Sequence, residues 1–556
     1  MSNHRILEKW SRRLIGFFQE QDVSSDYLTI LDNIGREVTG LRSSDQPEAL
    51  KILWGPSFSI YPPSFTLDRL LSYALRLRGV TVLPIYCDSV QSRECNFFGG
   101  VWGGGDSFPD NCRRCVAQSQ RLWGDNPVPA LRLSDYLRPD DEAQIERVLT
   151  GADWDTLQDF TQDGMPLGSW AKDILVNNYV VADDRLIPDH EELGLSHLRN
   201  LLRLKIAYAR ILDDTRPDRV IANDSYYGMW AILQQLCEQR GIPFYTHWPV
   251  TRDRVAFAHA GAAMGLDFRP AWPAFCASPL SSEQRQRVED WLNGQSGGRG
   301  LLINTAVVES HQNEGFDLSS LNTGKPTALL TANVIWDLAA LNKQVVFAGM
   351  MEWIISTIEW FARHPEYQLI LKAHPAEQHP TIPETHERVE SVLLQRGVVL
   401  PANVFFVSPR AKVSVYDFLP LTRVGIVHTT SVGFEMAAFG LPVITTARAP
   451  YRGFGFTYDV ETPEDYFSQL SMLLAGDDNE NKQRRIDLAY KFISFYHFHY
   501  YIRLGLSESR WNNSPLLHVQ TANELLPGRN RALDYIVDSI LNGLPIVSKD
   551  RWPVES

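Results

Sequence analysis

The sequence is poor in cysteine and has no long apolar run. Six cysteines in 556 residues are too few for a disulfide scaffold. No run reaches the roughly 18–20 apolar residues that a membrane-spanning helix requires. The start, MSNHRILEKWSRRLIGFFQEQD, is basic and amphipathic, without the apolar core and cleavage site of a signal peptide. We therefore expect a cytoplasmic protein whose terminal helix docks on it or rests on the inner face of the cell membrane.

The sequence also has no excess of positive charge, because its 53 Lys and Arg are outnumbered by 66 Asp and Glu and the formal net charge is −13. An acidic surface repels backbone phosphates, so we expect no nucleic-acid partner. With 44% hydrophobic and 21% charged residues, the composition is that of a globular protein. The length predicts about two to four domains.

Four of the cysteines lie close in sequence. Cys112 and Cys115 have the spacing of half a zinc site, which Cys87 and Cys95 could complete. The other interpretation is a set of free thiols packed around a loop. We expect no essential cofactor and keep structural zinc open as the alternative.

Apolar runs alternate with helical patterns in both halves of the chain. We predict two doubly wound, Rossmann-like α/β domains facing a cleft, where ligands bind near the carboxyl ends of the strands. The predicted strands are 51–55, 80–86, 218–224, 242–248, 327–334, 367–373, 403–408, 423–428 and 441–446, and the clearest helices are 67–75, 225–240, 351–362, 384–396, 432–439 and 531–543.

A Gly/Ser-rich stretch followed by Gly324 and Pro326 marks a domain boundary. We expect a helical segment over 1–45 and an acceptor domain with insertions over 46–320. A nucleotide-sugar domain should span 321–480, followed by carboxyl-terminal helices over 481–556.

The first motif is LKAHPAE, residues 371–377. His374 follows a predicted strand, where Pro375 ends the ladder. Its imidazole could donate a hydrogen bond to a phosphate oxygen or act as an acid, and Lys372 could add positive charge. The alternative is a histidine that only caps the strand or pairs with a carbonyl.

The second motif is VHTTSVGFEMAAFGLP, residues 427–442. Hydroxyls at the start of a helix, beside exposed N–H groups, are suited to binding an anion. Gly433 would let the ligand approach, and Glu435 would accept ribose hydroxyls. The alternative is an ordinary N-cap and a carboxylate favoured by the helix dipole. The hydroxyl residues are Thr429, Thr430 and Ser431.

The third motif is ARAPYRGFGFTYDVETPEDY, residues 447–466. The guanidinium fork of Arg452 suits phosphates and acidic sugars, unless it pairs with Asp459. Further cations near these strand ends, which would help to form a local positive pocket, are Lys372, Arg410, Lys412 and Arg448.

A carboxylate follows a predicted strand of the first half, in VIANDSYYG. We predict that Asp224 is the base for an acceptor hydroxyl, with Asp88 and Asp68 as weaker candidates. An Asx N-cap is the alternative. No DxD element is convincing, because the paired aspartates at 140–141, 183–184 and 213–214 resemble loops or helix ends.

The segments LILKAHPAE, SVYDFLPLTRVGIVHTTSVGFEMAAFGLPVI and YRGFGFTYD resemble bacterial capsule-polysaccharide biosynthesis glycosyltransferases, which have the GT-B fold. The pairing of the HP and Ser/Thr motifs is also similar to that of sialyl-, polysialyl- and Kdo transferases with CMP-sugar donors. The resemblance covers roughly residues 325–470. It implies that His374, Thr430 and Ser431 hold the nucleotide phosphate, and that no catalytic metal is needed.

The expected function is therefore transfer of a sugar from a nucleotide donor, CMP favoured, to a surface glycan. One alternative is a glycerol- or ribitol-phosphate transferase with a CDP donor, although its usual acidic residue is replaced here by His428 and Thr429. Others are a nucleotide-sugar epimerase and a noncatalytic binding subunit. The sugar, the linkage, the stereochemical course and the oligomeric state stay open.

Overall fold

The structure is a computed structural model. It describes residues 25–41, 50–95, 108–226, 228–296, 314–336, 343–378, 385–476, 478, 482–509 and 515–554. The basic segment over residues 1–22, for which a docked or membrane-resting helix was predicted, lies outside the described residues.

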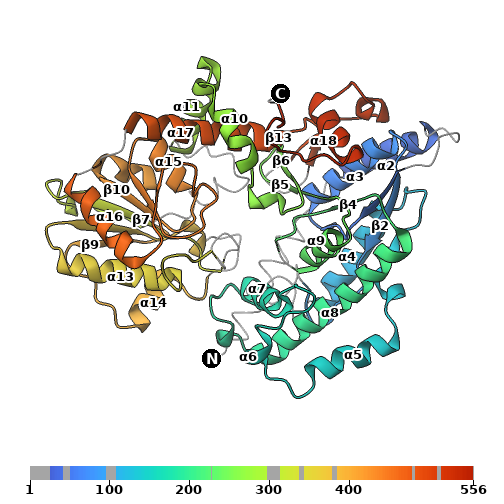
Figure 1. Cartoon of the computed structure of the whole chain (residues 1–556), viewed down its shortest axis with the longest axis horizontal. Coiled ribbons are helices and arrows are strands. Elements are labelled where there is room, and N and C mark those ends of the chain that lie inside the picture. The colour runs from blue at the N-terminus through green and yellow to red at the C-terminus, as the bar shows by residue number, and fades with distance from the viewer. Residues whose placement is uncertain are drawn as a thin grey trace. The chain divides into compact units, whose positions relative to one another are not determined.

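The chain forms two compact units (Figure 1). The first contains Met1–Tyr179, Asp183–Pro273 and Phe498–Ser556, and the second contains Val180–Ala182 and Ala274–His497. The structure thus divides the chain differently from the predicted boundaries at 320/321 and 480/481. Residues 498–556 return to the first unit because their strand β13 pairs with β6 and their helix α18 packs on α3.

The first unit is built on a sheet of order β13-β6-β5-β4-β1-β2-β3 within the described residues. Strands β1 to β5 pair in parallel with one another, whereas β6 pairs antiparallel with both β5 and β13. The strands are β1 (Lys51–Trp54), β2 (Thr81–Tyr86), β3 (Leu131–Arg132), β4 (Arg219–Ala222), β5 (Phe244–Pro249), β6 (Arg254–His259) and β13 (Tyr501–Arg503); β14 (Ser507–Ser509) and β15 (Pro515–Leu517) form a separate hairpin.

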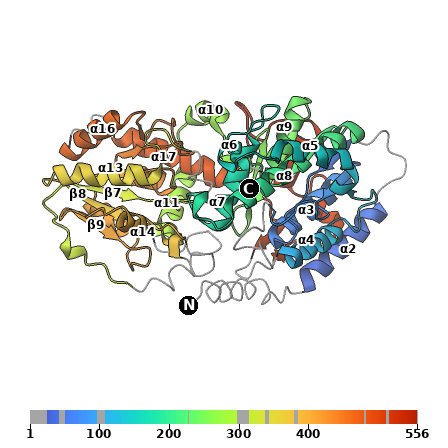
Figure 2. The same ribbon diagram turned by 90° about the horizontal axis from the view of Figure 1, so that it is seen from below.

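Helices cover both faces of this sheet, as Figures 1 and 2 show. Ile52 and Trp54 of β1 belong to one core and Leu53 to the other, as the two-residue repeat of a strand requires. The first face carries α2 (Ser25–Leu41), α3 (Pro62–Arg76) and α18 (Arg531–Leu541); the second carries α5 (Pro139–Leu149), α6 (Trp154–Leu157), α7 (Leu167–Tyr179), α8 (His190–Thr215) and α9 (Gly228–Gln239). Helix α4 (Phe108–Leu122) contacts β2.

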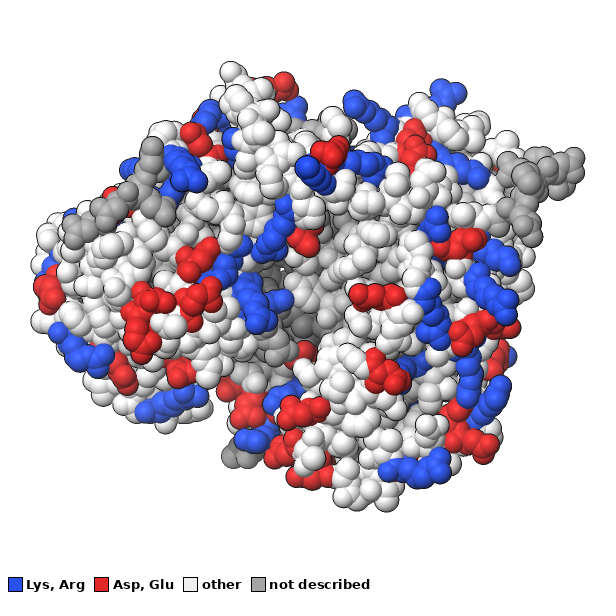
Figure 3. All heavy atoms as spheres, in the orientation of Figure 1, with Lys and Arg blue, Asp and Glu red and all other residues white. Residues whose placement is uncertain are grey.

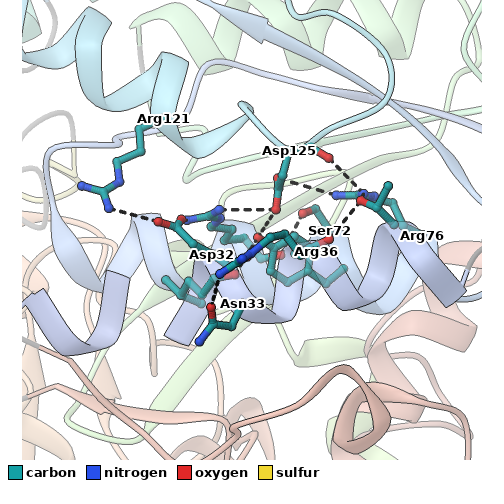
Figure 4. A network of polar contacts seen from close by, with 12 residues as sticks. Asp32, Asn33, Arg36, Ser72, Arg76, Arg121 and Asp125 are labelled. Carbon is teal, nitrogen blue, oxygen red and sulfur yellow. Dashed lines mark hydrogen bonds and ion pairs between the residues drawn. The ribbon is translucent and has the colours of Figure 1, made fainter. Parts of the chain in front are cut away.

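A network of charges fastens α2 to α3 (Figure 4). Arg69, only 3% exposed, contacts Asp32 at 2.7 Å and Asp125 at 3.3 Å. Arg76 donates to the backbone carbonyl of Asp125 at 3.1 Å. Since a buried charge without its partner is costly, this network makes the position of α2 specific.

The second unit has a parallel sheet of order β12-β11-β10-β7-β8-β9. Each strand that the apolar runs predicted here is present, within a few residues of its predicted bounds. The strands are β7 (Thr327–Thr331), β8 (Gln368–Lys372), β9 (Val404–Val407), β10 (Val424–Val427), β11 (Val443–Thr445) and β12 (Tyr458–Asp459).

Helices also cover both faces of the second sheet. The core beneath one face contains residues of α13 (Met350–Arg363), α14 (Val389–Gln395) and α16 (Pro463–Ala475). On the other face α15 (Val432–Ala438) packs so closely that a Cβ on Gly425 would lie 2.6 Å from Met436 Cε. Helix α17 (Lys482–Phe495) covers α15, and α10 (Trp272–Cys276) and α11 (Ser282–Ser296) precede the sheet.

The predicted fold class is confirmed, because each unit is a Rossmann-like α/β layer structure. The predicted helical segment over 481–556 also contains strands β13 to β15. Within the described ranges, no helix is long and apolar enough to cross a membrane. Figure 3 shows charges of both signs interspersed over the visible surface of each unit.

Candidate functional site

The HP and Ser/Thr motifs lie at the same edge of the second sheet. Thr331, at the end of β7, pairs with Lys372 of β8 on one side and Val427 of β10 on the other. His374 lies two residues after Lys372, and Thr429 lies two residues after Val427. Their strands, β8 and β10, are about 10 Å apart because β7 lies between them. We call this region, with residues 331–333, 372–377 and 428–435, the second edge. The predicted proximity of the two motifs is confirmed.

The imidazole of His374 has a defined orientation. Its Nδ1 accepts a hydrogen bond from the backbone N–H of Ala376 at 3.1 Å. A neutral ring that accepts at Nδ1 carries its proton on Nε2. In a neutral His374 ring, Nε2 is therefore the donor nitrogen.

Lys372 and Glu377 are both buried and lie close enough to influence each other's charge. Burial lowers the pKa of Lys372 to about 8 and raises the pKa of Glu377 to about 7, while the attraction between them opposes both shifts. Lys372 Nζ donates to the carbonyl of Ser408 at 3.3 Å. Glu377 Oε1 accepts from the Val389 N–H at 3.2 Å, whereas its Oε2 has no partner in the described part of the chain. Sequence reasoning missed Glu377, although it belongs to the HPAE motif.

Buried hydroxyls at this edge have no partner in the part of the chain that the structure describes. They are Thr429 Oγ1 and Thr331 Oγ1. Ser431 is exposed at the start of α15, but its side chain makes no capping bond. Buried polar groups are rarely left unpaired. Because α15 has only seven residues, these side chains define the site more than the helix dipole does, and they suit a ligand rich in acceptors.

Two residues that were not predicted complete the second edge. Asn333 Oδ1 accepts from the backbone N–H of Thr429 at 3.1 Å, which fixes the start of the loop. His428 stacks on Trp353 with ring centroids 5.7 Å apart. Burial lowers the pKa of His428 to about 4, so its ring is neutral at pH 7.

Gly433 and Glu435 lie in different surroundings from those predicted. A Cβ on Gly433 would lie 2.0 Å from Tyr451 Oη, which donates to the carbonyl of Thr430 at 2.7 Å. Tyr451, rather than a ligand, therefore occupies the space beside Gly433. Glu435 is buried and accepts from the Tyr416 hydroxyl, and burial raises its pKa to about 7. These contacts do not favour the predicted bond to ribose.

The guanidinium of Arg452 is used within its own loop. It donates to the carbonyls of Thr445 at 3.0 Å and Val460 at 2.6 Å, and it pairs with Glu461 at 2.7 Å. Asp459 instead accepts from the Thr445 hydroxyl at 2.6 Å. The contacts of Arg452 hold the loop after β11 together, and they do not favour the predicted phosphate contact.

The other predicted cations contribute little at the second edge. Arg410 pairs with Glu314 at 3.4 Å. Arg448 and Lys412 are exposed. Lys372 and His374 are therefore the cationic and donor groups that the strand ends bring together.

Asp224 lies at the carboxyl end of β4 in the first unit. Its Oδ1 accepts from the backbone N–H groups of Ser225 at 3.1 Å and Met264 at 3.3 Å. Burial raises its pKa to about 6, although these hydrogen bonds and His247 oppose the shift. Asp224 is therefore ionised at neutral pH and basic enough to accept a proton. The Asx-cap alternative is not favoured, because these bonds do not go to α9.

A second carboxylate lies behind the same strand ends. His247 Nε2 is 2.7 Å from Asp68 Oδ1, and both residues are fully buried. The Ser57 hydroxyl donates to the other oxygen of Asp68. Asp68 is thus committed to internal contacts, and Asp88 accepts from the Ser134 N–H at 3.0 Å. Both are poorer candidates for the base than Asp224. We call residues 55–61, 68, 222–225 and 247–248 the first edge.

The four clustered cysteines are free thiols in the structure. Burial raises the pKa of Cys115 to about 12 and also raises that of Cys87. Cys112 Sγ donates to Ser89 Oγ at 3.2 Å. All four cysteines are free, Cys95 included, and no group of three His, Cys, Asp or Glu in the described ranges could hold a metal ion. Structural zinc at these cysteines stays a prediction.

Comparisons with known proteins give similarity of fold alone. No family model matches the chain, and no curated protein matches it. Among solved structures, the beta Kdo 2,4 transferase KpsC of Thermosulfurimonas dismutans is 13% identical, with 56% of this chain and 87% of that chain covered and a TM-score of 0.31. The UDP-GlcNAc 2-epimerase of Neisseria meningitidis bound to UDP-GlcNAc is 11% identical, with 81% and 99% covered and a TM-score of 0.23. The spinosyn rhamnosyltransferase SpnG is 12% identical, with 80% and 96% covered and a TM-score of 0.24.

Proposed function

We propose that this protein is a glycosyltransferase that binds a nucleotide-sugar donor at the second edge, CMP-sugars favoured, and transfers the sugar to a glycan. The observation that carries the proposal is the set of hydroxyls that have no partner among the described residues and lie at the strand ends that carry Lys372 and His374. Such a set is suited to the oxygens of a phosphate. The resemblance of the motifs to capsule-polysaccharide glycosyltransferases supports the same conclusion, and a surface glycan is the expected acceptor.

The chemistry follows from where charge develops. When the bond between the sugar and the donor phosphate breaks, negative charge gathers on the leaving phosphate. A hydrogen bond from His374 Nε2 strengthens at that moment, and so does the attraction to Lys372, so both favour the transition state over the bound substrate. The hydroxyls of Thr429, Thr430 and Ser431 would orient the phosphate.

Asp224 supplies the second half of the reaction in this proposal. Its raised pKa of about 6 lets it take a proton from an acceptor hydroxyl near neutral pH. His247, which is fully buried against Asp68, lowers the pKa of Asp224 and so opposes the effect of burial.

We propose that the transfer needs no metal ion. The groups that meet the phosphate here are an ammonium, an imidazole and hydroxyls, whereas hard divalent cations prefer sets of carboxylate and carbonyl oxygens. Addition of EDTA should therefore leave the turnover number unchanged. A loss of activity that Mg²⁺ restores would contradict this part of the proposal.

A thermal-shift screen tests donor binding. CMP, CDP, UDP and GDP are added separately to the full chain, because a ligand that binds the native state raises its melting temperature. We expect the largest shift from a cytidine nucleotide and its loss in Thr429→Val/Thr430→Val/Ser431→Ala. Ser468→Ala is the matched control, since Ser468 is an exposed serine of α16.

Two outcomes would overturn the proposal. One is the absence of a shift with all four nucleotides, and the other is an equal shift in the triple variant and the control. Product analysis with CMP-Kdo, CMP-N-acetylneuraminate and CDP-glycerol then identifies the reaction. Conversion of a donor sugar without an acceptor would indicate an epimerase, and consumption of CDP-glycerol a polyol-phosphate transferase.

A further inference from the structure

Three aromatic rings lie together at the first edge. The ring centroids of Phe58 and Tyr61 are 5.8 Å apart, those of Phe58 and Trp248 6.3 Å, and those of Tyr61 and Trp248 6.0 Å. The interplanar angles are 31°, 11° and 20° in the same order. All three side chains are partly exposed. We call these residues the aromatic platform.

The distances exclude a single stacked column. If three near-parallel rings occupied successive layers, the outer two would be at least about 7 Å apart, because carbon atoms in contact are separated by about 3.5 Å. No pair in the platform is that far apart. At least two rings therefore lie side by side, and the platform is broader than one ring.

The platform is fixed to the strand ends that carry Asp224. Phe58 donates its backbone N–H to Asn223 Oδ1 at 2.8 Å, and Asn223 directly precedes Asp224. Trp248 follows His247 on β5. Since β1, β4 and β5 are neighbours in the sheet, the rings and the carboxylate belong to one local structure.

The platform also has polar atoms without partners. Neither the Tyr61 hydroxyl nor Trp248 Nε1 makes a hydrogen bond with another described residue. Burial raises the pKa of Tyr61 to about 12, so its hydroxyl keeps its proton and can donate. The residue Asn223 is 1% exposed, and its Nδ2 is unpaired in the described ranges. Tyrosine and tryptophan normally find partners for these groups.

We propose that the aromatic platform binds a neutral pyranose ring of the acceptor glycan, an inference that rests on the proposed transfer function and deepens it. One face of a pyranose presents C–H groups that pack on aromatic rings, and its edge presents hydroxyls. The free donors of Tyr61, Trp248 and Asn223 match those hydroxyls. A neutral sugar fits better than an acidic one, because Asp224 already places a negative charge beside the rings.

The binding of simple glycosides tests the platform directly. Saturation-transfer NMR is recorded on the full chain with the methyl β-pyranosides of glucose, galactose, mannose and N-acetylglucosamine. We expect at least one to bind, with the strongest transfer to ring C–H protons. Trp248→Ala should weaken binding about tenfold or more through loss of the stacking surface. Tyr61→Phe keeps the ring and should weaken binding about three- to tenfold.

The matched control is Trp170→Ala. Trp170 is a partly buried tryptophan of α7 in the same unit, packed against the same core as Phe58 but not part of the platform, and its loss should leave glycoside binding unchanged. Thermal unfolding of each variant checks the fold, and Tyr61→Phe provides the test if Trp248→Ala is unstable.

Three results would overturn the inference. No glycoside binds the wild-type chain, or Trp248→Ala and Tyr61→Phe bind as Trp170→Ala does, or Trp248→Ala removes the thermal shift from CMP and so assigns the rings to the nucleobase. A chain that binds a glycoside but no nucleotide would refute the proposed function while retaining the platform, so the two failures are distinguishable.

Discussion

The two sheet edges differ in which of their polar groups are partnered within the protein. At the first edge the carboxylates are held: Asp68 contacts His247 and accepts from Ser57, and Asp224 accepts from two backbone N–H groups. At the second edge Thr331 and Thr429 leave their hydroxyls without partners in the described part of the chain. At the first edge the carboxylates thus have partners within the protein, while Asn223 Nδ2 and the donors of the aromatic platform have none among the described residues. At the second edge it is the buried hydroxyls that lack the partners a ligand would supply.

This difference separates stability from binding. Removing a carboxylate of the first edge breaks contacts that exist in the free protein, so it should affect folding as well as reaction. Removing an unpartnered hydroxyl of the second edge should affect the ligand more than the fold. The predictions below test this contrast, beginning with the largest effect.

Asp224→Asn should reduce transfer by about 10²–10⁴-fold, the usual contribution of a positioned base. The amide keeps the size of the side chain and can still accept the two N–H bonds, so nucleotide binding should not change. In the wild type the rate should rise with pH through about 6, where Asp224 ionises. Steady-state rates across pH and thermal shifts with CMP measure both effects.

The control for this variant is Asp213→Asn, which removes a carboxylate of the same unit that is 67% exposed and paired with Arg240. If Asp224→Asn retains the activity of this control, Asp224 is not the base.

His374→Ala should reduce turnover by about 10²–10³-fold, the scale of losing one donor to a developing negative charge. Because the bond strengthens in the transition state, KM should change much less than kcat. His518→Ala, which removes a histidine that is 44% exposed, should leave both constants unchanged. If KM instead rises by the same factor while kcat stays unchanged, His374 serves only the binding of the ground state.

The fold was predictable wherever a strand formed an apolar run bounded by glycine or proline. All the parallel strands from β7 to β11 were found in this way, because strands buried on both faces of a sheet are continuously apolar. The return of residues 498–556 to the first unit could not be predicted from the sequence. β13 is only three residues long, and its pairing with β6 joins segments that are far apart in the sequence.

The location of a site residue was predictable only where that residue directly follows the end of a strand. His374 and the hydroxyl residues follow strand ends, so their common edge could be inferred from alternation alone. Glu377, Asn333 and His247 matter because of burial and of contacts made by distant segments, which no local pattern reveals.

Two predicted residues show the opposite failure. Gly433 and Arg452 are residue types that often contact ligands. In the structure, however, Tyr451 fills the space beside Gly433 and Glu461 pairs with Arg452. A flexible, polar loop supplies partners of its own when it folds, and this competition between local contacts and a ligand cannot be judged before the loop geometry is known.

Glu435→Gln should change how stability depends on pH. The carboxyl of Glu435 has a pKa of about 7 in the folded protein against an ordinary value of 4.5. Between these values the folded state holds the proton and the unfolded state has lost it. Wild-type stability therefore falls as pH rises from 4.5 through about 7, by up to about 3 kcal/mol, and the glutamine variant lacks this loss.

Urea unfolding at several pH values measures the difference between wild type and Glu435→Gln. Glu464→Gln, at an exposed glutamate of α16, is the control for the general effect of losing a carboxylate on stability. A difference between Glu435→Gln and wild type that is constant across pH would mean that Glu435 is not held neutral by burial.

Thr429→Val should have the smallest effect on the free protein and the most informative one. Valine matches the shape of threonine but lacks the buried hydroxyl that has no partner, so the free protein should gain about 1 kcal/mol of stability or stay unchanged. Nucleotide binding should weaken about three- to tenfold, because the ligand loses one donor.

The matched variant is Thr357→Val in α13, whose hydroxyl donates to the Trp353 carbonyl at 2.7 Å and lies 2.9 Å from Tyr466 Oη. It should destabilise the protein and leave nucleotide binding unchanged. If both variants destabilise equally, the hydroxyl of Thr429 is already used in the free protein, and the contrast between the two edges fails.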